Sequence, residues 1–243
     1  MLDRSKLSTE KRNLRSRNLD RLSAIGIVDL LAREDRLVAP AVARERRRIA
    51  RAVEGAEDRA RDGRRVMDSK RVSKRDVVVG IAACGVTPFV RAAVRRARER
   101  GARTVFVTCA PEAKGRIEAD VIINPHVGPE AVTGSTRLKA GTATKLVLNA
   151  LTTAAMVRLG KVYGNLMVDL RATNEKLRDR AERIVMEMTK LARGPARRLL
   201  RRAGGETKTA IVMHRCGVSA RDARRLLDAA GGMLRRALEG HPR

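Results

Sequence analysis

Hydroxyl-bearing and basic side chains are concentrated in residues 128–141 (GPEAVTGSTRLKAG). Three hydroxyls surround a glycine and two cations follow, in the order Thr133, Gly134, Ser135, Thr136, Arg137 and Lys139. If a helix begins at Thr136, both cations fall in its first turn, where they oppose the helix dipole and lower stability. Because a bound anion would remove that conflict, the pattern favours an anion-binding site over an N-cap cluster with two solvated cations.

A second candidate is the sequence CGVTP at residues 84–88. Gly85 would let the backbone approach a ligand closely. Thr87 followed by Pro88 is typical of a helix start, with Thr at the N-cap and Pro at the first helical position, and the free N–H groups there can bind an anion. An ordinary tight strand-to-helix turn explains the same residues. Taken alone, the sequence that begins at Cys84 favours that ordinary turn.

An acidic spot interrupts an Arg-rich stretch at Glu54, Glu57 and Asp58. A carboxylate crowded by other acids can transfer protons in catalysis. From spacing alone, we favour a surface cluster paired with Arg51 or Arg61 on one helix.

Metal and cysteine chemistry are not indicated. The three cysteines form no C-x-x-C pair, so neither a disulfide framework nor a zinc site is predicted. His214 and Cys216 have no further ligands nearby in the sequence, and His126 is interpreted as a loop residue.

Three apolar runs predict the strands that would position these loops: residues 76–84 (DVVVGIAAC), 104–110 (TVFVTCA) and 119–125 (ADVIINP). Continuous runs of this kind are typical of strands buried on both faces. A helix is expected from Thr87 to Gly101, and the succession of strand, helix and strand predicts a parallel sheet with right-handed crossovers. Ligands bind beyond the carboxyl ends of such strands, where both candidate loops would lie.

The remaining chain is predicted to be largely helical. Residues 1 to about 20 are expected to be a polar arm, residues 20–62 a helix and residues 63–74 a basic connector. Residues 136–160 form a helix that is apolar nearly all round, which predicts burial. After residue 174 a short repeat, ARRLLRRAGG at 196–205 and ARRLLDAAGG at 223–232, indicates two helical hairpins of one small domain.

Composition limits the possible partners. The 243 residues include 43% hydrophobic residues, enough for an α/β domain with a helical appendage. The net charge of +27 would attract polyanions, but only 1% of residues are aromatic and the arginines are spread along helices. We therefore expect a solvated basic surface and no dedicated nucleic-acid site. The absence of an apolar leader and of a 20-residue apolar run predicts no membrane contact and a cytoplasmic location.

Several of these stretches together resemble one family. They are DVVVGIAA at 76–83, TGSTRLKAGT at 133–142, KLVLN at 145–149, MVRLGKVYGNLMVD at 156–169, ATNEKL at 172–177 and AIVM at 210–213, with AVEGAED at 52–58. The chain is identified by them as a member of the N-acetylmuramic acid 6-phosphate etherases.

The resemblance implies an α/β fold of the sugar isomerase (SIS) type, a parallel sheet flanked by helices, followed by a small C-terminal all-α domain. Residues 1–62 would be an N-terminal arm and helices, 63–171 an incomplete SIS-type domain and 172–243 the helical domain. The implied reaction opens the sugar ring, removes the C2 proton, expels lactate from C3 and adds water. Glu57 matches one of the family's two catalytic glutamates; no cofactor or metal is implied, and a homodimer is expected.

The chain departs from the family pattern at two places. The glycine-rich first strand and loop that carry the second glutamate have no match here, and Cys84 and Val86 replace the usual Ser and Arg. These departures predict slow or undetectable turnover, and they keep a non-catalytic sugar-phosphate-binding regulator, like the glucokinase regulatory protein, as the alternative. Loss of the first strands would also leave residues 77–81 as an open sheet edge, which predicts self-association.

Overall fold

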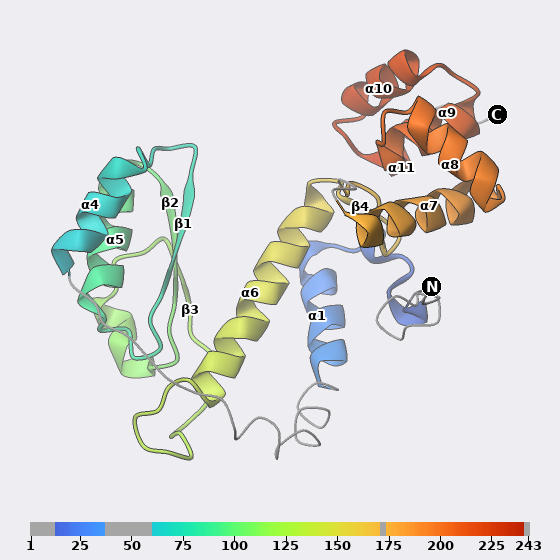
Figure 1. Cartoon of the computed structure of the whole chain (residues 1–243). Coiled ribbons are helices and arrows are strands. Elements are labelled where there is room, and N and C mark those ends of the chain that lie inside the picture. Colours follow the sequence, from blue (N-terminus) through green and yellow to red (C-terminus); the bar gives the residue numbers. More distant parts are fainter. Residues whose placement is uncertain (1–12, 37–59, 171–173, 241–243) are drawn as a thin grey trace. The chain divides into compact units, whose positions relative to one another are not determined.

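The computed structural model describes residues 13–36, 60–170 and 174–240 (Figure 1). The chain divides into two compact units, one made of Met1–Glu34 with Ala150–Arg243 (unit 1) and the other of Asp35–Asn149 (unit 2). Helix α6 (Lys139–Arg158) contributes residues to both.

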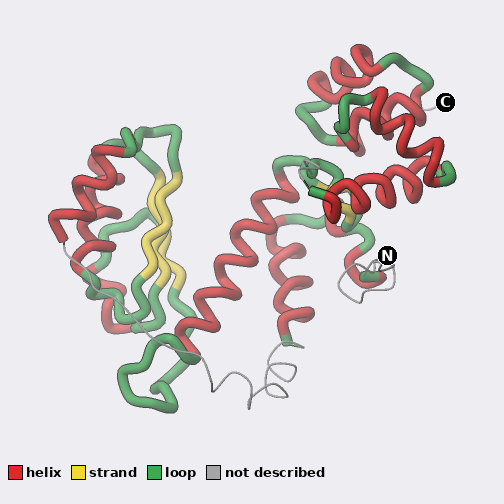
Figure 2. Tube along the Cα trace, in the orientation of Figure 1, coloured by secondary structure: helices red, strands yellow, loops and turns green. Residues whose placement is uncertain are grey.

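A three-stranded parallel sheet forms the centre of unit 2 (Figure 2). Its strands are β1 (Val77–Ile81), β2 (Arg103–Val107) and β3 (Val121–Ile123), in the spatial order β1-β2-β3. Val79 pairs with Val105, which in turn pairs with Val121. The predicted parallel α/β arrangement is therefore confirmed, with strands shorter than the apolar runs suggested.

Helices α4 (Ala60–Ser69) and α5 (Pro88–Glu99) lie on one side of this sheet (Figure 1). Helix α5 buries Ala93, Val94 and Ala97, and Val94 packs with Phe106 of β2 while Ala97 packs with Val78 of β1. A Cβ at Gly80 would lie 2.4 Å from Val94 Cγ2, so the glycine in β1 is what allows α5 to approach so closely.

The connector predicted for residues 63–74 is wrong over its first half, because residues 63–69 belong to α4. Gly63 is buried, and a Cβ there would lie 2.2 Å from the Phe89 carbonyl oxygen. The charged residues that suggested a solvated connector instead pair with α5, through Arg64–Glu99 at 2.9 Å and Asp68–Arg96 at 2.8 Å. A glycine-mediated helix contact and cross-helix ion pairs were not visible in the local pattern.

Burial of β1 on both faces was also predicted, and this is wrong for the described part of the chain. Val77, Val79 and Ile81 are 65%, 38% and 39% exposed, while the alternate residue Gly80 faces α5. The physical reason is that α4 and α5 occupy one face only. β1 also lies at an edge of the described sheet.

Helix α6 begins at Lys139 and not at Thr136, and it is not buried all round. Among its residues only Ala140 and Val157 are buried, and Met156 is 51% exposed. Its apolar surface exceeds what the described residues cover.

The N-terminal segment of unit 1 comprises two 3₁₀ turns, η3 (Leu14–Ser16) and η4 (Leu19–Arg21), and helix α1 (Ala24–Asp35). Leu19 and Ile27 are buried together with Val157. Asp20 pairs with Arg235 at 2.6 Å. The described part of the expected polar arm thus packs within unit 1, because Leu19 and Asp20 both contact residues from the C-terminal part of that unit.

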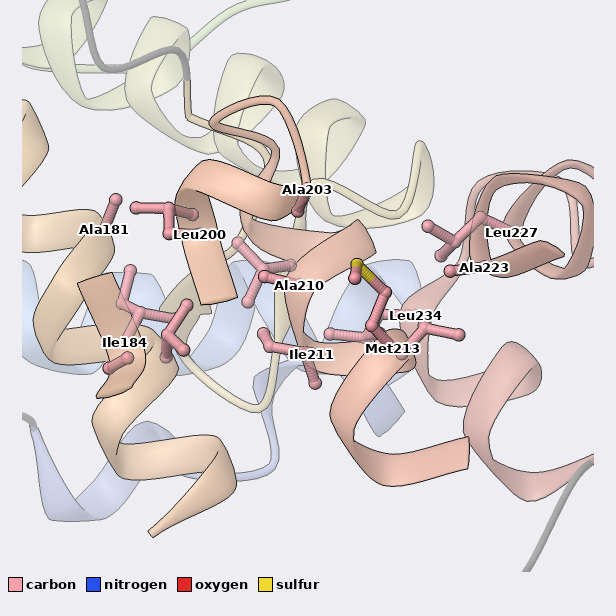
Figure 3. Close-up of a cluster of buried hydrophobic side chains, with 14 of the residues drawn as sticks. Ala181, Ile184, Leu200, Ala203, Ala210, Ile211, Met213, Ala223, Leu227 and Leu234 are labelled. Carbon is pink, nitrogen blue, oxygen red and sulfur yellow. The ribbon is translucent and has the colours of Figure 1, made fainter. Parts of the chain in front are cut away.

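The rest of unit 1 is a hairpin, β4 (Val162–Tyr163) and β5 (Leu166–Met167), and five helices: α7 (Glu175–Thr189), α8 (Arg193–Arg202), α9 (Thr207–Cys216), α10 (Ala220–Ala229) and α11 (Leu234–Glu239). Their apolar faces meet in one core around Ile184, Leu200, Ile211 and Leu234 (Figure 3). None of the helices within residues 13–36, 60–170 and 174–240 has the length and hydropathy that a bilayer crossing requires.

The short repeat forms two equivalent helix ends, which confirms the predicted hairpins α8–α9 and α10–α11. Ala196 and Ala223 are fully buried. The Gly205 N–H donates to the Leu200 carbonyl at 2.9 Å, and the Gly232 N–H donates to the Leu227 carbonyl at 2.7 Å. The glycines following each helix have positive φ, which a left-handed C-terminal cap requires.

Candidate functional site

The carboxyl ends of the three parallel strands lie at one edge of the sheet in unit 2. Hydrogen bonds continue the strand pairing past the strand ends, from Ala82 N to Val107 O at 3.0 Å and from Cys109 N to Ala83 O at 2.8 Å. On the other side, Thr108 N donates to Ile123 O at 3.0 Å. The segments that follow β1, β2 and β3 are therefore held beside one another, where open parallel sheets bind ligands.

The loop after β1 is a tight turn. Gly85 has φ +69° and its N–H donates to the Ala82 carbonyl at 2.8 Å. A Cβ at this position would lie 2.4 Å from the Ala113 Cβ in the turn η5 (Pro111–Arg116), so packing as well as conformation requires glycine. Cys84 is exposed, and Thr87 occupies the predicted N-cap position of α5, although its side chain makes no capping hydrogen bond.

The segment that leads into α6 is a series of turns. The Ser135 N–H donates to Val132 O at 2.9 Å, and Thr136 N–H donates to Gly134 O at 3.0 Å. Thr133 and Gly134 are exposed, and the Ser135 and Thr136 side chains are half-buried. A Cβ at Gly134 would meet no atom within 4 Å, so its φ of +77° and not close packing accounts for the glycine.

Glu130 supplies the negative charge at the start of α6. Its carboxylate accepts hydrogen bonds from Lys139 N and Ala140 N, both at 2.9 Å. The Ala140 N–H lowers the pKa of Glu130 below its ordinary value, and the N–H and charge of Lys139 act in the same direction, while burial opposes them. The conflict with the helix dipole, which suggested an external anion, is thus resolved within the chain.

The cationic side chains beside this cap remain available. Arg137 and Lys139 are exposed, and neither forms an ion pair within the described part of the chain. The Lys139 Nζ lies 3.8 Å from the position that a Cβ on Gly128 would occupy. Two exposed cations next to three hydroxyls can bind an anion such as a phosphate, through charge-assisted hydrogen bonds.

Sequence reasoning missed two residues at this edge, Glu130 and Asn124. Asn124 directly follows β3; its Nδ2 donates to the Ala110 carbonyl at 3.3 Å, and its Oδ1 is buried with no partner among the described residues. A buried amide oxygen without a donor is costly, so a ligand hydroxyl donating to it would be stabilising. The sequence signal that could have identified Asn124 was a polar amide residue immediately after a buried strand.

The remaining predicted residues are not brought into this site. Glu57, with Glu54 and Asp58, lies outside the described residues. His126 is exposed in the loop after β3, and His214 and Cys216 belong to α9 in unit 1. Over residues 13–36, 60–170 and 174–240, no group of three His, Cys, Asp or Glu side chains is placed to hold a metal ion.

Replacing Glu130 with glutamine is expected to lower the thermal midpoint at neutral pH, because the carboxylate bonded to two helix N–H groups is lost. The pKa of Glu130 is lower in the folded than in the unfolded protein. Its contribution to stability is therefore present above the unfolded pKa of about 4.3 and is lost as the pH falls through the folded pKa. The gap between parent and variant should therefore narrow as the pH falls below the unfolded pKa and close once the pH is below the folded pKa. Thermal scans across pH measure this, with Glu112→Gln, an exposed acid in η5, as control. An equal gap at every pH would contradict the assignment.

Comparison with known proteins identifies clear relatives, although no family model matches the chain. It is 39% identical to a protein named N-acetylmuramic acid 6-phosphate etherase from Synechocystis over 298 residues, covering 99% of this chain and 98% of the relative. A protein of the same name from Trichormus variabilis is 40% identical and covers 89% of each chain. Another, from Yersinia pestis, is 53% identical over 78% of this chain and 64% of the relative.

Proposed function

Because this chain belongs to the N-acetylmuramic acid 6-phosphate etherase family, we propose that it cleaves the lactyl ether of N-acetylmuramic acid 6-phosphate. The products are N-acetylglucosamine 6-phosphate and D-lactate, and the enzyme is a carbon–oxygen lyase acting in amino sugar recycling. The observation that carries this proposal is the 39% identity that extends over almost the whole length of both chains.

The sugar phosphate is proposed to bind at the carboxyl edge of the sheet. Its phosphate would pair with the exposed Arg137 and Lys139 and accept hydrogen bonds from the Ser135 and Thr136 hydroxyls. The N–H groups at the start of α6 are already bonded to Glu130, so the side chains carry this part of the recognition. Thr133 and Gly134 complete the loop.

The sugar itself is proposed to lie toward the ends of β1 and β3. There, the turn of Cys84, Gly85 and Thr87 borders the site, and the Asn124 Oδ1, which has no partner in the described part of the chain, can accept a hydrogen bond from a sugar hydroxyl. Glu57 is proposed as the base that removes the C2 proton. When the carboxylate takes this proton, the C3–O bond breaks and lactate leaves; water then adds to the resulting double bond.

Binding can be tested separately from turnover. Millimolar N-acetylglucosamine 6-phosphate should raise the thermal midpoint of the parent, because the ligand binds only the folded state. Arg137→Gln should remove most of this shift. Arg75→Gln is the matched control, because Arg75 is also exposed but precedes β1 at the amino edge of the sheet. D-lactate release from N-acetylmuramic acid 6-phosphate, measured beside the Synechocystis relative, tests the activity. No stabilisation and no lactate would refute the proposed function.

A homodimer is the proposed assembly. The basis is the apolar surface that the described residues leave uncovered, with β1 at an open sheet edge and Val77 65% exposed. Such an edge readily pairs with another strand. Light scattering should give a dimer or a larger species, and Val77→Lys should shift it toward monomer. Ile25→Lys, which changes an equally exposed residue in α1, should not. A monomeric parent protein would contradict the proposal.

A further inference from the structure

Two of the three cysteines lie at the ends of neighbouring parallel strands. Cys84 follows β1 and is exposed, while Cys109 follows β2 and is half-buried. The Cys109 N–H donates at 2.8 Å to the carbonyl of Ala83, the residue immediately before Cys84. The third cysteine, Cys216, belongs to α9 in unit 1.

Backbone geometry limits the separation of this pair. The Cys84 Cα lies about 2.8 Å from the Ala83 oxygen across their planar peptide, and the Cys109 Cα lies about 1.5 Å from its own nitrogen. With the 2.8 Å hydrogen bond between them, the two Cα atoms are at most about 7 Å apart. Disulfides usually join Cα atoms roughly 4.4–6.8 Å apart, so this upper limit lies close to the range that a disulfide spans.

The two thiols have different surroundings. The Cys109 Sγ lies 3.8 Å from the Ala140 carbonyl oxygen in the first turn of α6. Burial raises the pKa of the Cys109 thiol, the charges of Glu130 and Cys84 raise it further, and a hydrogen bond with Thr144 opposes them. Cys109 is therefore protected from direct oxidation, whereas an oxidant in solution reaches the exposed Cys84 first.

We propose that Cys84 and Cys109 form a reversible disulfide that links the ends of β1 and β2. With a peroxide as oxidant, the Cys84 thiolate attacks one peroxide oxygen, the O–O bond breaks, and hydroxide leaves and is protonated to water. The Cys84 sulfenic acid is then attacked by the Cys109 sulfur, the S–O bond breaks, and a second water leaves with the Cys109 proton. Both sulfurs are oxidised and the peroxide is reduced; a dithiol reductant reverses the reaction by thiol–disulfide exchange.

The disulfide would act on both candidate loops. It fixes the turn that contains Cys84 and Gly85, and it draws the Cys109 sulfur away from the Ala140 carbonyl at the start of α6. This consequence rests on the proposed function: the oxidised protein should bind the sugar phosphate more weakly than the reduced protein, because both loops border the proposed site.

The test is peptide mapping of the full chain after brief treatment with hydrogen peroxide and alkylation of the remaining thiols. A cross-linked Cys84–Cys109 peptide is expected, removable with dithiothreitol, and equally present in Cys216→Ser. Cys109→Ser should give no cross-link and should leave Cys84 as a sulfenic or sulfinic acid. Recovery of Cys109 as an alkylated thiol in the parent, with Cys84 singly oxidised, would overturn the proposal.

Thermal scans with N-acetylglucosamine 6-phosphate separate the effect of the disulfide on ligand binding from the binding itself. A ligand-induced shift that is present in the reduced protein and at least halved in the oxidised protein supports the regulatory effect. An unchanged shift in a protein that carries the mapped disulfide overturns that effect. If the reduced protein shows no shift at all, the proposed sugar-phosphate binding fails, whereas the disulfide is still judged by the peptide map.

Discussion

Glu57→Gln is expected to remove the D-lactate release that this chain catalyses. Glutamine keeps the size of the side chain but cannot accept the C2 proton, and positioned acid–base groups contribute about 10²–10⁴-fold in rate. Because the family resemblance predicts that the second catalytic glutamate is missing from this chain, the parent rate is itself expected to lie far below that of the Synechocystis relative. The Glu57 variant should therefore fall to the background of the assay.

Glu54→Gln is the matched control for this experiment, since it removes a neighbouring carboxylate from the same AVEGAED stretch. It should retain the activity of the parent. If Glu57→Gln stays within threefold of the parent, or if the two variants lose activity equally, the role assigned to Glu57 is wrong. Parent turnover equal to that of the Synechocystis relative would show that the prediction of a missing block is wrong.

Gly85→Ala is expected to be the most destabilising substitution at the carboxyl edge of the sheet. Two effects add. The first is conformational, because alanine in the left-handed region of backbone angles costs about 1–2 kcal/mol. The new Cβ would also lie 2.4 Å from the Ala113 Cβ, and overpacking of this kind costs about 1–3 kcal/mol. The free energy of unfolding from urea titration measures the sum, and the ligand-induced thermal shift should be lost with it.

Gly134→Ala separates the two effects. Its φ of +77° imposes the same conformational cost, but a Cβ there meets no atom within 4 Å, so about 1–2 kcal/mol is expected. The double change Gly85→Ala with Ala113→Gly should recover the overpacking part, because it removes the Cβ that is struck. Equal losses for Gly85→Ala and Gly134→Ala would contradict the close contact with η5.

Local sequence patterns were sufficient for the order of the three strands and of α5 in unit 2. The apolar runs that became β1, β2 and β3, and the Thr87–Pro88 helix start, are set by neighbouring residues and by steric limits on the backbone, which act over a few positions. The same holds for the repeat after residue 196, where paired glycines end two equivalent helices. The family motifs, being contiguous, were also readable and agree with the relatives found.

Which faces are buried, and which elements pack on them, could not be predicted from local sequence in the same way. An apolar run predicts that something covers it, but which faces are covered depends on where other elements pack, so the exposure of Val77 and Met156 became visible only in three dimensions. Gly63 illustrates the reverse case, because only the approach of Phe89 explains why α4 continues through a segment that resembles a connector.

At the candidate site, the sequence by itself determined which residue types are available: hydroxyls, two cations and a glycine turn beyond the ends of parallel strands. Only the tertiary structure decided how they are used. Glu130 caps α6 because the turns between it and Ala140 bring a side chain to distant backbone N–H groups. The approach of Cys84 to Cys109 likewise arises from strand register, as does the position of Asn124, whose Oδ1 has no partner among the described residues. Strand register joins residues that are far apart in the sequence and therefore leaves no local pattern.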